Sequence, residues 1–186
     1  MLQARAFPIV AMSYSAIMTK AGFKFAKKFF STYKEVFYVL DESTAIKNPS
    51  SKRTRRVVAS GRWANYKRIL TGTPITNSPF DAYKQIQFLD KDFWKQYGFL
   101  DYATFKSYFA RWETGFNFQG KEKREYKYVD EYLHMDELSE IIGQISSRVV
   151  KDDALDLPPK LYSKRYFEMT KEQTRVYREL KNSYMT

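Results

Sequence analysis

Cysteine is absent from the 186 residues of this chain, and histidine occurs only once, as His134. The first absence excludes disulfides and cysteine-ligated zinc, and it fits a protein of the cytosol. Because no second candidate ligand lies near His134 in the sequence, we interpret this residue as structural rather than metal-binding or catalytic. No apolar run approaches the roughly 18–20 residues of a membrane span, so we expect no membrane partner.

A second absence concerns nucleotide binding. The chain contains no Gly-x-x-x-x-Gly-Lys-[Ser/Thr] loop, and Gly22 with Lys24 does not form one. The amides and the lysine of such a loop hold the β- and γ-phosphates of ATP. Phosphoryl transfer depends on positioning and charge neutralisation by several groups at once. We therefore expect the chain alone to bind ATP weakly and to hydrolyse it negligibly.

The positive charge is concentrated in the first part of the chain. The formal net charge is +11, and residues 1–80 hold 14 basic and 3 acidic residues, whereas residues 81–186 hold 18 of each. The whole excess therefore lies in residues 1–80. Such an asymmetry indicates a polyanionic partner, and nucleic acid is the first candidate, although a merely soluble basic surface is the simpler alternative.

Two short apolar runs end abruptly in small or acidic residues. The run Val36–Leu40 is β-branched and aromatic and predicts a buried strand, which Asp41 and Glu42 follow at once. The run 68–70 predicts a second strand, followed by Thr71, Gly72, Thr73 and Pro74. In an open α/β sheet, ligands bind beyond the carboxyl ends of the strands. Taken singly, an acidic pair is more often a solvated loop or a helix cap, and Thr-Gly-Thr-Pro is usually a turn.

Together the two segments resemble a known family. Residues 39–49 resemble the Walker B segment, or motif II, of superfamily-two helicases, and Ile46-Lys47-Asn48 resembles the Swi/Snf-related branch. Residues 70–77 resemble motif III of that branch, and 157–160 resemble its passage towards a second motor domain. The chain departs from the family in having Ser43-Thr44 where Ala-His is usual, and in retaining only Arg148 and Lys151 of a basic pattern.

The resemblance implies roles for the residues that match it. Asp41 would hold Mg²⁺, and Glu42 would polarise the water that attacks ATP. Thr71, Gly72, Thr73 and Pro74 would couple the nucleotide site to a face that binds double-stranded DNA. The missing P-loop and second motor domain would come from flanking sequence or from another chain.

Further residues are candidates for contacts with DNA phosphates. By resemblance, Ser13, Tyr14 and Ser15 lie where the family approaches the DNA backbone, with the alternative that Ser15 only caps the next helix. Four cations crowd the first turns of a predicted helix, where they oppose its dipole, and this conflict suggests a use in phosphate binding. These cations are Lys52, Arg53, Arg55 and Arg56.

The expected fold class is α/β, a partial RecA-like parallel sheet with helices followed by an α-helical insertion. Residues 1–90 would form the C-terminal half of the first RecA-like domain, 91–147 a helical protrusion-like insertion, and 148–186 a connector. Within 91–145, the polar segment 114–127 predicts an exposed loop or hairpin. The predicted strands are 7–12, 36–40, 68–70 and 161–169, and the predicted helices are 16–33, 52–60, 79–89, 136–147 and 171–184.

The sequence thus favours a fragment of an ATP-dependent DNA translocase. One alternative is a non-catalytic nucleic-acid-binding module or a truncated relic, in which the acids survive only as caps. Another is a metal-dependent nuclease using Asp41 and Glu42, although no further acid has an obvious partner spacing. The compact chain with Asp-Glu-Ser-Thr suggests a bacterial or phage source, and hence the cytoplasm of a bacterial or phage-infected cell.

Overall fold

The computed structural model describes residues 8–119, 122–149, 158 and 161–184. The chain divides into two compact units, Met1–Ile145 and Ser146–Thr186. In the second unit the helix α8 (Lys171–Tyr184) follows an extended stretch. The strand predicted at 161–169 is not formed, because these residues have no pairing partner among the described residues and are exposed.

The first unit is built on a short parallel sheet. Strands β1 (Phe37–Leu40) and β2 (Tyr66–Ile69) pair in parallel, with Phe37 opposite Tyr66 and Leu40 opposite Ile69. The connection between them runs through the 3₁₀ turn η1 (Ser43–Ile46) and the helix α3 (Lys52–Gly61), as a parallel crossover requires. Both strands lie within two residues of their predicted positions, and the α/β fold class is confirmed.

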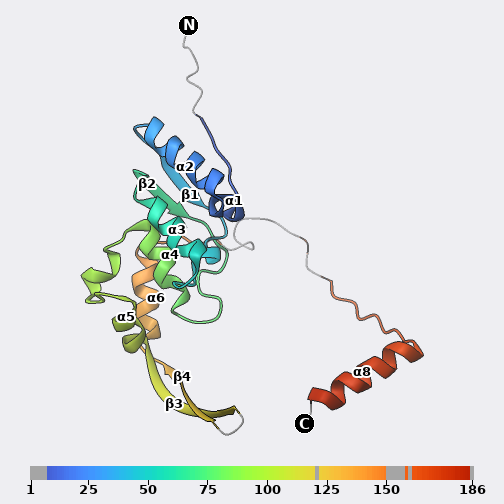
Figure 1. Ribbon diagram of the computed structural model, residues 1–186. Helices are drawn as coiled ribbons and strands as arrows, with labels where there is room; N and C mark the ends of the chain where they lie inside the picture. The colour runs from blue at the N-terminus through green and yellow to red at the C-terminus, as the bar shows by residue number, and fades with distance from the viewer. Residues whose placement is uncertain (1–7, 120–121, 150–157, 159–160, 185–186) are drawn as a thin grey trace. The chain divides into compact units, whose positions relative to one another are not determined.

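Helices cover one face of this sheet (Figure 1). The side chains of α2 (Lys20–Thr32), α3 and α4 (Asp81–Leu89) bury Leu40 of β1 in a small core. Tyr38 lies between the rings of Phe30 and Phe88, at centroid distances of 5.3 and 5.1 Å. On the other face Phe37 is 56% exposed, and Val39 and Tyr66 are exposed as well. A parallel sheet is normally covered on both faces, so this sheet presents an uncovered apolar face.

The first helical segment differs from the prediction. The single helix expected at 16–33 is two helices, α1 (Tyr14–Met18) and α2, separated by Thr19. Thr19 is extended, and its side chain caps α2 by accepting from the amide of Gly22. A Cβ atom at Gly22 would lie 2.1 Å from the carbonyl oxygen of Ala16, so only glycine allows this tight break. The prediction missed the break because threonine inside a helical pattern gives little sign of a cap.

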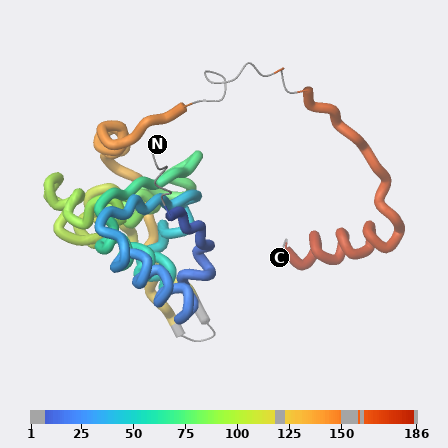
Figure 2. The backbone as a smooth tube through the Cα atoms, turned by 90° about the horizontal axis from the view of Figure 1, so that it is seen from above, coloured from blue at the N-terminus to red at the C-terminus, as the bar shows by residue number. Residues whose placement is uncertain are grey.

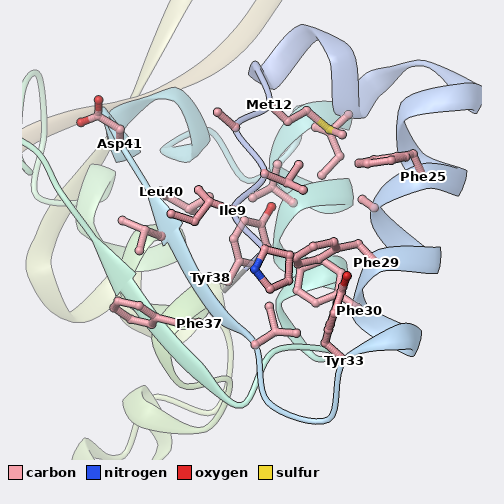
Figure 3. A pocket seen from close by; sticks show the side chains of 18 of the residues that line it. Ile9, Met12, Phe25, Phe29, Phe30, Tyr33, Phe37, Tyr38, Leu40 and Asp41 are labelled. Atoms are coloured by element: carbon pink, nitrogen blue, oxygen red, sulfur yellow. The ribbon is translucent and has the colours of Figure 1, made fainter. Parts of the chain in front are cut away.

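The strand predicted at 7–12 is also not formed in the described residues 8–12, and Phe7 lies outside them. Residues 8–12 carry no strand pairing, and Ile9 is 91% exposed. An apolar groove of about 930 Å³ separates this segment from β1 and α2 (Figure 3). A strand needs hydrogen bonds to a neighbouring backbone. Because the groove separates residues 8–12 from β1, these residues do not pair with this strand.

A second and larger core joins α4 and Phe80 to residues 91–145. The turn η2 (Phe93–Tyr97), the helix α5 (Tyr102–Phe109) and the helix α6 (Met135–Gly143) pack their apolar side chains together. Between α5 and α6 the strands β3 (Ala110–Gln119) and β4 (Glu122–Tyr132) form an antiparallel hairpin. Both views show this hairpin projecting from the rest of the unit (Figures 1 and 2). Residues 114–119 and 122–127 therefore pair as the two arms of a hairpin, one of the two predicted alternatives.

The remaining helices fall near their predicted positions. α3 begins after Ser51, whose side chain accepts from the amide of Thr54, and it ends at Gly61. α4 begins at Asp81 rather than at residue 79, and α6 ends at Gly143 rather than at 147. Within the described ranges, no helix has the length and apolar character needed to cross a bilayer.

Candidate active site at the carboxyl edge of the sheet

The two motifs found in the sequence meet at the carboxyl edge of β1 and β2. The Leu70 amide donates a hydrogen bond to the Leu40 carbonyl at 2.8 Å, which extends the ladder by one residue. Beyond it, the Ser43 amide donates to the Leu70 carbonyl at 3.0 Å. The acid pair and the Thr-Gly-Thr-Pro segment therefore start from neighbouring strand ends, the position where open α/β sheets bind ligands.

The acid pair is exposed and held in an unusual backbone conformation. Glu42 has φ 47° and ψ 56°, in the left-handed region that residues with a Cβ atom seldom adopt. The Glu42 amide donates to the carboxylate of Asp41 at 3.0 Å, which holds the Asp41 side chain against the backbone of Glu42. Backbone conformations of this kind cluster at functional sites, so the geometry favours a functional role over a simple cap.

The residues at this edge are compatible with magnesium held together with a phosphate ligand. The described part of the chain contains no cluster of three or more His, Cys, Asp or Glu residues that could enclose a metal. Magnesium, however, is usually bound by one or two carboxylates together with substrate phosphates and waters. The exposed carboxylate of Asp41, at a strand end, can supply such a ligand.

Tyr14 lies directly behind the acid pair. Its hydroxyl donates a hydrogen bond to the backbone carbonyl of Asp41 at 2.7 Å. Burial, with smaller contributions from Tyr38 and from the charge of Asp41, raises the pKa of Tyr14 to about 12. The phenol therefore stays protonated and remains a donor at physiological pH. This contact gives Tyr14 a support role at the acid pair, in addition to the DNA contact predicted for it.

The neighbouring serines take different positions. Ser13 is the N-cap of α1, since its hydroxyl accepts from the Ala16 amide at 3.1 Å. The capping alternative considered for Ser15 is therefore wrong, because Ser15 already lies inside the helix. Its side chain is exposed and accessible to a ligand.

The four cations of α3 separate into two groups. Lys52, Arg53 and Arg55 are exposed near the start of the helix. Arg56 instead turns towards the end of α1, where its guanidinium donates to the carbonyls of Ile17 and Met18. The same guanidinium lies over the ring of Phe23, 4.8 Å from its centroid. The contacts of Arg56 therefore hold α1 and α2 against α3, and the other three cations are the accessible ones.

The Thr-Gly-Thr-Pro segment forms an open turn beside the acid pair. The Thr73 amide donates to the hydroxyl of Thr71 at 3.3 Å, and Gly72 and Thr73 are exposed. No atom lies within 4 Å of the position that a Cβ of Gly72 would occupy. The backbone is thus accessible at this point, so a ligand can approach it closely.

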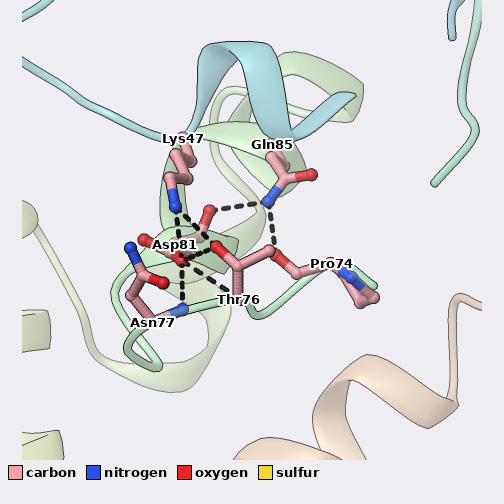
Figure 4. A network of polar contacts seen from close by, with 6 residues as sticks. All are labelled: Lys47, Pro74, Thr76, Asn77, Asp81 and Gln85. Carbon is pink, nitrogen blue, oxygen red and sulfur yellow. Dashed lines mark hydrogen bonds and ion pairs between the residues drawn. The ribbon is translucent and has the colours of Figure 1, made fainter. Parts of the chain in front are cut away.

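Sequence reasoning missed a polar cluster next to this turn (Figure 4). The carboxylate of Asp81, at the start of α4, accepts from the amides of Thr76 and Asn77 at 3.1 and 3.0 Å. It also accepts from the Thr76 hydroxyl at 2.7 Å and from Lys47 Nζ at 3.3 Å. Burial disfavours the charge, but these hydrogen bonds outweigh it and hold the pKa of Asp81 below its usual value. The only sequence signal was an acid in the first turn of a helix, which is common.

Comparison with known proteins places these features in a family. Residues 2–186 match the model of the SNF2-related domain. The TATA-binding protein-associated factor 172 of Homo sapiens is 30% identical over 83% of this chain and 8% of its own length. MOT1 of Saccharomyces cerevisiae, another TATA-binding protein-associated factor, is 32% identical over 76% of this chain and 7% of its own length.

A third relative covers more of the chain. The ATP-dependent DNA helicase DDM1 of Arabidopsis thaliana is 28% identical over 95% of this chain and 21% of its own length. The chain thus spans about a fifth or less of these three relatives. No solved structure matches it. The predicted bacterial or phage source, with a cytoplasmic location in such a cell, is wrong, because these relatives come from eukaryotes.

Proposed function

This chain belongs to the SNF2-related domain family, and on that premise we propose that it is part of a DNA-dependent ATPase that moves along duplex DNA. The observation that carries the proposal is the meeting of the acid pair and the Thr-Gly-Thr-Pro turn at one sheet edge. Two of the relatives support it in their names: DDM1 is an ATP-dependent DNA helicase, and MOT1 is a TATA-binding protein-associated factor.

In this proposal the chain supplies the acidic wall of the nucleotide site. Asp41 would hold Mg²⁺ through its carboxylate, and the bound metal would supply positive charge against the phosphates of ATP. Glu42 orients the attacking water and accepts its proton. The left-handed backbone at Glu42 aims its carboxylate, and the Tyr14 hydroxyl holds the Asp41 carbonyl in place. Thr71 and Thr73 transmit conformational changes from the nucleotide site to the face that binds DNA.

The remaining parts of the nucleotide site would come from a further polypeptide segment. Such a segment carries the P-loop, and a second motor domain supplies charge on the opposite side of the nucleotide. The uncovered face of β1 and β2, with Phe37, Val39 and Tyr66 exposed, and the apolar groove beside β1 support this proposal. Apolar surface of this extent on a parallel sheet is typical of an interface rather than of a free surface.

The DNA-binding part of the proposal rests on charge. Residues 1–80 carry the entire excess of +11, and Lys52, Arg53 and Arg55 are exposed at the start of α3. Exposed cations of this kind bind phosphates without regard to base sequence, and their binding weakens as salt rises. Ser15 and the start of α1 add hydroxyl groups that can position the backbone.

Replacement of Glu42 by glutamine tests the proposal, in a protein that joins this chain to a P-loop-bearing segment. The amide cannot accept the water's proton, so we expect ATP hydrolysis to fall at least about a hundredfold. Affinity for duplex DNA should stay within twofold of the unsubstituted protein. Retained hydrolysis in Glu42→Gln would show that Glu42 is not the base.

The two alternative functions give different results in the same assays. A non-catalytic nucleic-acid-binding module would bind DNA but show no hydrolysis that depends on Glu42. A metal-dependent nuclease would cleave plasmid DNA with Mg²⁺ and without ATP, and Asp41→Asn would abolish that cleavage. We expect no cleavage under these conditions.

A further inference from the structure

Gln85 is a completely buried polar residue on α4. Its side chain has no solvent exposure, and it lies on a helix whose other buried residues include Tyr83, Ile86 and Phe88. A buried amide is costly unless its hydrogen-bonding groups are satisfied. The partners of Gln85 therefore indicate why a polar residue occupies this place.

All the hydrogen-bonding groups of this amide are used. Its nitrogen donates to the carbonyls of Pro74 and Asp81, at 2.7 and 2.8 Å. Its oxygen accepts from the hydroxyl of Ser43 at 2.6 Å. Two backbone carbonyls can only accept, so the nitrogen must face them, and this fixes the orientation of the amide. Ser43 is also completely buried, so water does not compete for this bond.

The partners of Gln85 belong to the two functional loops. Ser43 follows Glu42 directly in the chain, and Pro74 closes the Thr-Gly-Thr-Pro turn. The Gln85 side chain therefore extends from α4 and links the segment after the acid pair to the Thr-Gly-Thr-Pro turn. The polar cluster of Lys47, Thr76 and Asp81 joins the same two loops a second time, with Lys47 Nζ 2.5 Å from the Thr76 hydroxyl.

We propose that Gln85 is a positioning residue that makes the acid-pair loop and the Thr-Gly-Thr-Pro turn move as one unit. The inference rests on the proposed function, since it names the connection through which a change at Asp41 and Glu42 reaches residues 71–77. Ser43 stands where the Swi/Snf-related pattern usually has alanine, which has no hydroxyl to donate. The Ser43–Gln85 bond is thus a feature of this chain rather than of the general pattern.

The test compares the full chain with the double variant Ser43→Ala/Gln85→Leu. Replacing both Ser43 and Gln85 leaves neither side chain unpaired, and the carbonyl of the half-buried Pro74, which loses its donor, can be hydrated instead. Gln87→Leu is the matched control, because Gln87 lies on the same helix and its side chain accepts from Lys84 within that helix. The unfolding midpoints of all three proteins should agree within a few degrees.

Amide hydrogen exchange gives the first measurement. The Ser43 amide bonds to the Leu70 carbonyl and the Thr76 amide to Asp81, so both report on the contact between the loops. In the double variant we expect both amides to exchange at least tenfold faster than in the unsubstituted chain. In Gln87→Leu their exchange should not change.

A second measurement tests whether a change at Asp41 alters the structure of residues 74–77, which a test of stability does not show. Asp41→Asn is introduced into each background, and amide NMR shifts of residues 74–77 are recorded. In the unsubstituted and Gln87→Leu backgrounds we expect the substitution to shift these amides, and in the double variant we expect the shifts to fall by at least half. If exchange and shifts in the double variant match the unsubstituted chain, Gln85 only fills the core and the inference is wrong.

Two further outcomes show whether the inference about Gln85 or the proposed catalytic function has failed. If the double variant does not fold, Ser43→Ala alone removes one end of the bridge, and we expect at least threefold faster exchange of the Ser43 amide. Unchanged exchange there contradicts the inference. If the shifts are transmitted as expected but Glu42→Gln retains ATP hydrolysis, the bridge stands and the proposed catalytic role fails.

Discussion

The two cores of the first unit differ in how completely they are closed. The core around residues 80–141 buries twelve apolar residues, among them Trp94, Phe105 and Phe109, with almost no exposure. The core beneath β1 buries six, and the opposite face of the same strand is open. The region that contains Asp41 and Glu42 therefore has the smaller core and the larger uncovered apolar surface. The larger core is closed by α4 together with residues 91–145, whereas β1 and β2 keep one face open.

Charge separates the same two regions. Residues 1–80 hold the whole excess positive charge, and residues 81–186 are balanced. Function of the kind proposed here needs an exposed basic surface and an accessible sheet edge, and both reduce local stability. Residues 91–145 need neither an exposed basic surface nor an open sheet edge. Their aromatic side chains can therefore serve to pack the larger core.

The largest expected effect compares two phenylalanines. Phe105 is completely buried against Trp94, Phe99 and Phe109, whereas Phe37 is 56% exposed on the open face of β1. Phe105→Ala should lower the free energy of unfolding by about 3–5 kcal/mol, because it leaves a cavity. Phe37→Ala should lower it by only about 0.5 kcal/mol. Urea unfolding of the full chain measures both, and equal losses would show that the sheet face is closed.

Asp81→Asn tests the polar cluster that joins the sheet region to α4. We expect a loss of about 1–3 kcal/mol at pH 7, because an amide cannot replace a carboxylate that accepts four hydrogen bonds. The folded pKa of Asp81 is lowered, so its contribution is complete above the unfolded value of about 3.9 and is lost as the pH falls through the folded value.

Unfolding at a series of pH values checks this assignment. The difference between the unsubstituted chain and Asp81→Asn should be constant from about pH 7 to 5 and should shrink below about pH 4. A difference that does not change at acid pH would mean that the charge of Asp81 is not stabilised in the folded state.

Two arginines on α3 separate stability from DNA binding. Arg56→Gln should lower the free energy of unfolding by about 1–2 kcal/mol, since it loses its bonds to α1 and its contact with Phe23. Arg55→Gln should change stability by less than about 0.5 kcal/mol, but it should reduce the salt dependence of duplex binding by about one phosphate contact. Fluorescence anisotropy at several salt concentrations measures the second effect. If Arg55→Gln lowered stability and Arg56→Gln reduced the salt dependence of binding, the two assignments would be wrong.

Tyr14→Phe should reduce stability less than Phe105→Ala, Asp81→Asn or Arg56→Gln. Loss of the hydroxyl that bonds to the Asp41 carbonyl should cost about 1 kcal/mol. The folded pKa of Tyr14 is about 12 against an ordinary value of 10.0, so its contribution is full below about pH 10 and declines as the pH rises towards 12. Unfolding measured across that range should show a shallower alkaline decline in Tyr14→Phe, and identical declines would contradict the assignment.

The sequence predicted the elements whose signals are local. β1, β2 and α3 follow from apolar runs, a serine cap and a terminal glycine, and the rule for strand ends brought Asp41 and Thr71 to one edge. The break at Thr19 was missed because it depends on the close approach of Gly22 to the Ala16 carbonyl. The positions of Arg56 and Gln85 were missed because their partners are distant in sequence, and neither residue type signals a buried bridge.

The strands predicted at 7–12 and 161–169 fail for another reason. Their composition suits a strand, but a strand forms only where a partner supplies hydrogen bonds, and the described residues supply none. In residues 91–145, aromatic density alone did not distinguish helix from hairpin, so the full extent of β3 and β4 was not predicted.

The measurement that tests the central claim most directly is hydrogen exchange of the chain alone and of the chain joined to a P-loop-bearing segment. We predict that the amides of residues 8–14, β1 and β2 become at least a hundredfold better protected in the joined protein, whereas those of η2, α5 and α6 keep the same protection. Unchanged protection of β1 and β2 would contradict the claim that this sheet is completed by a further segment.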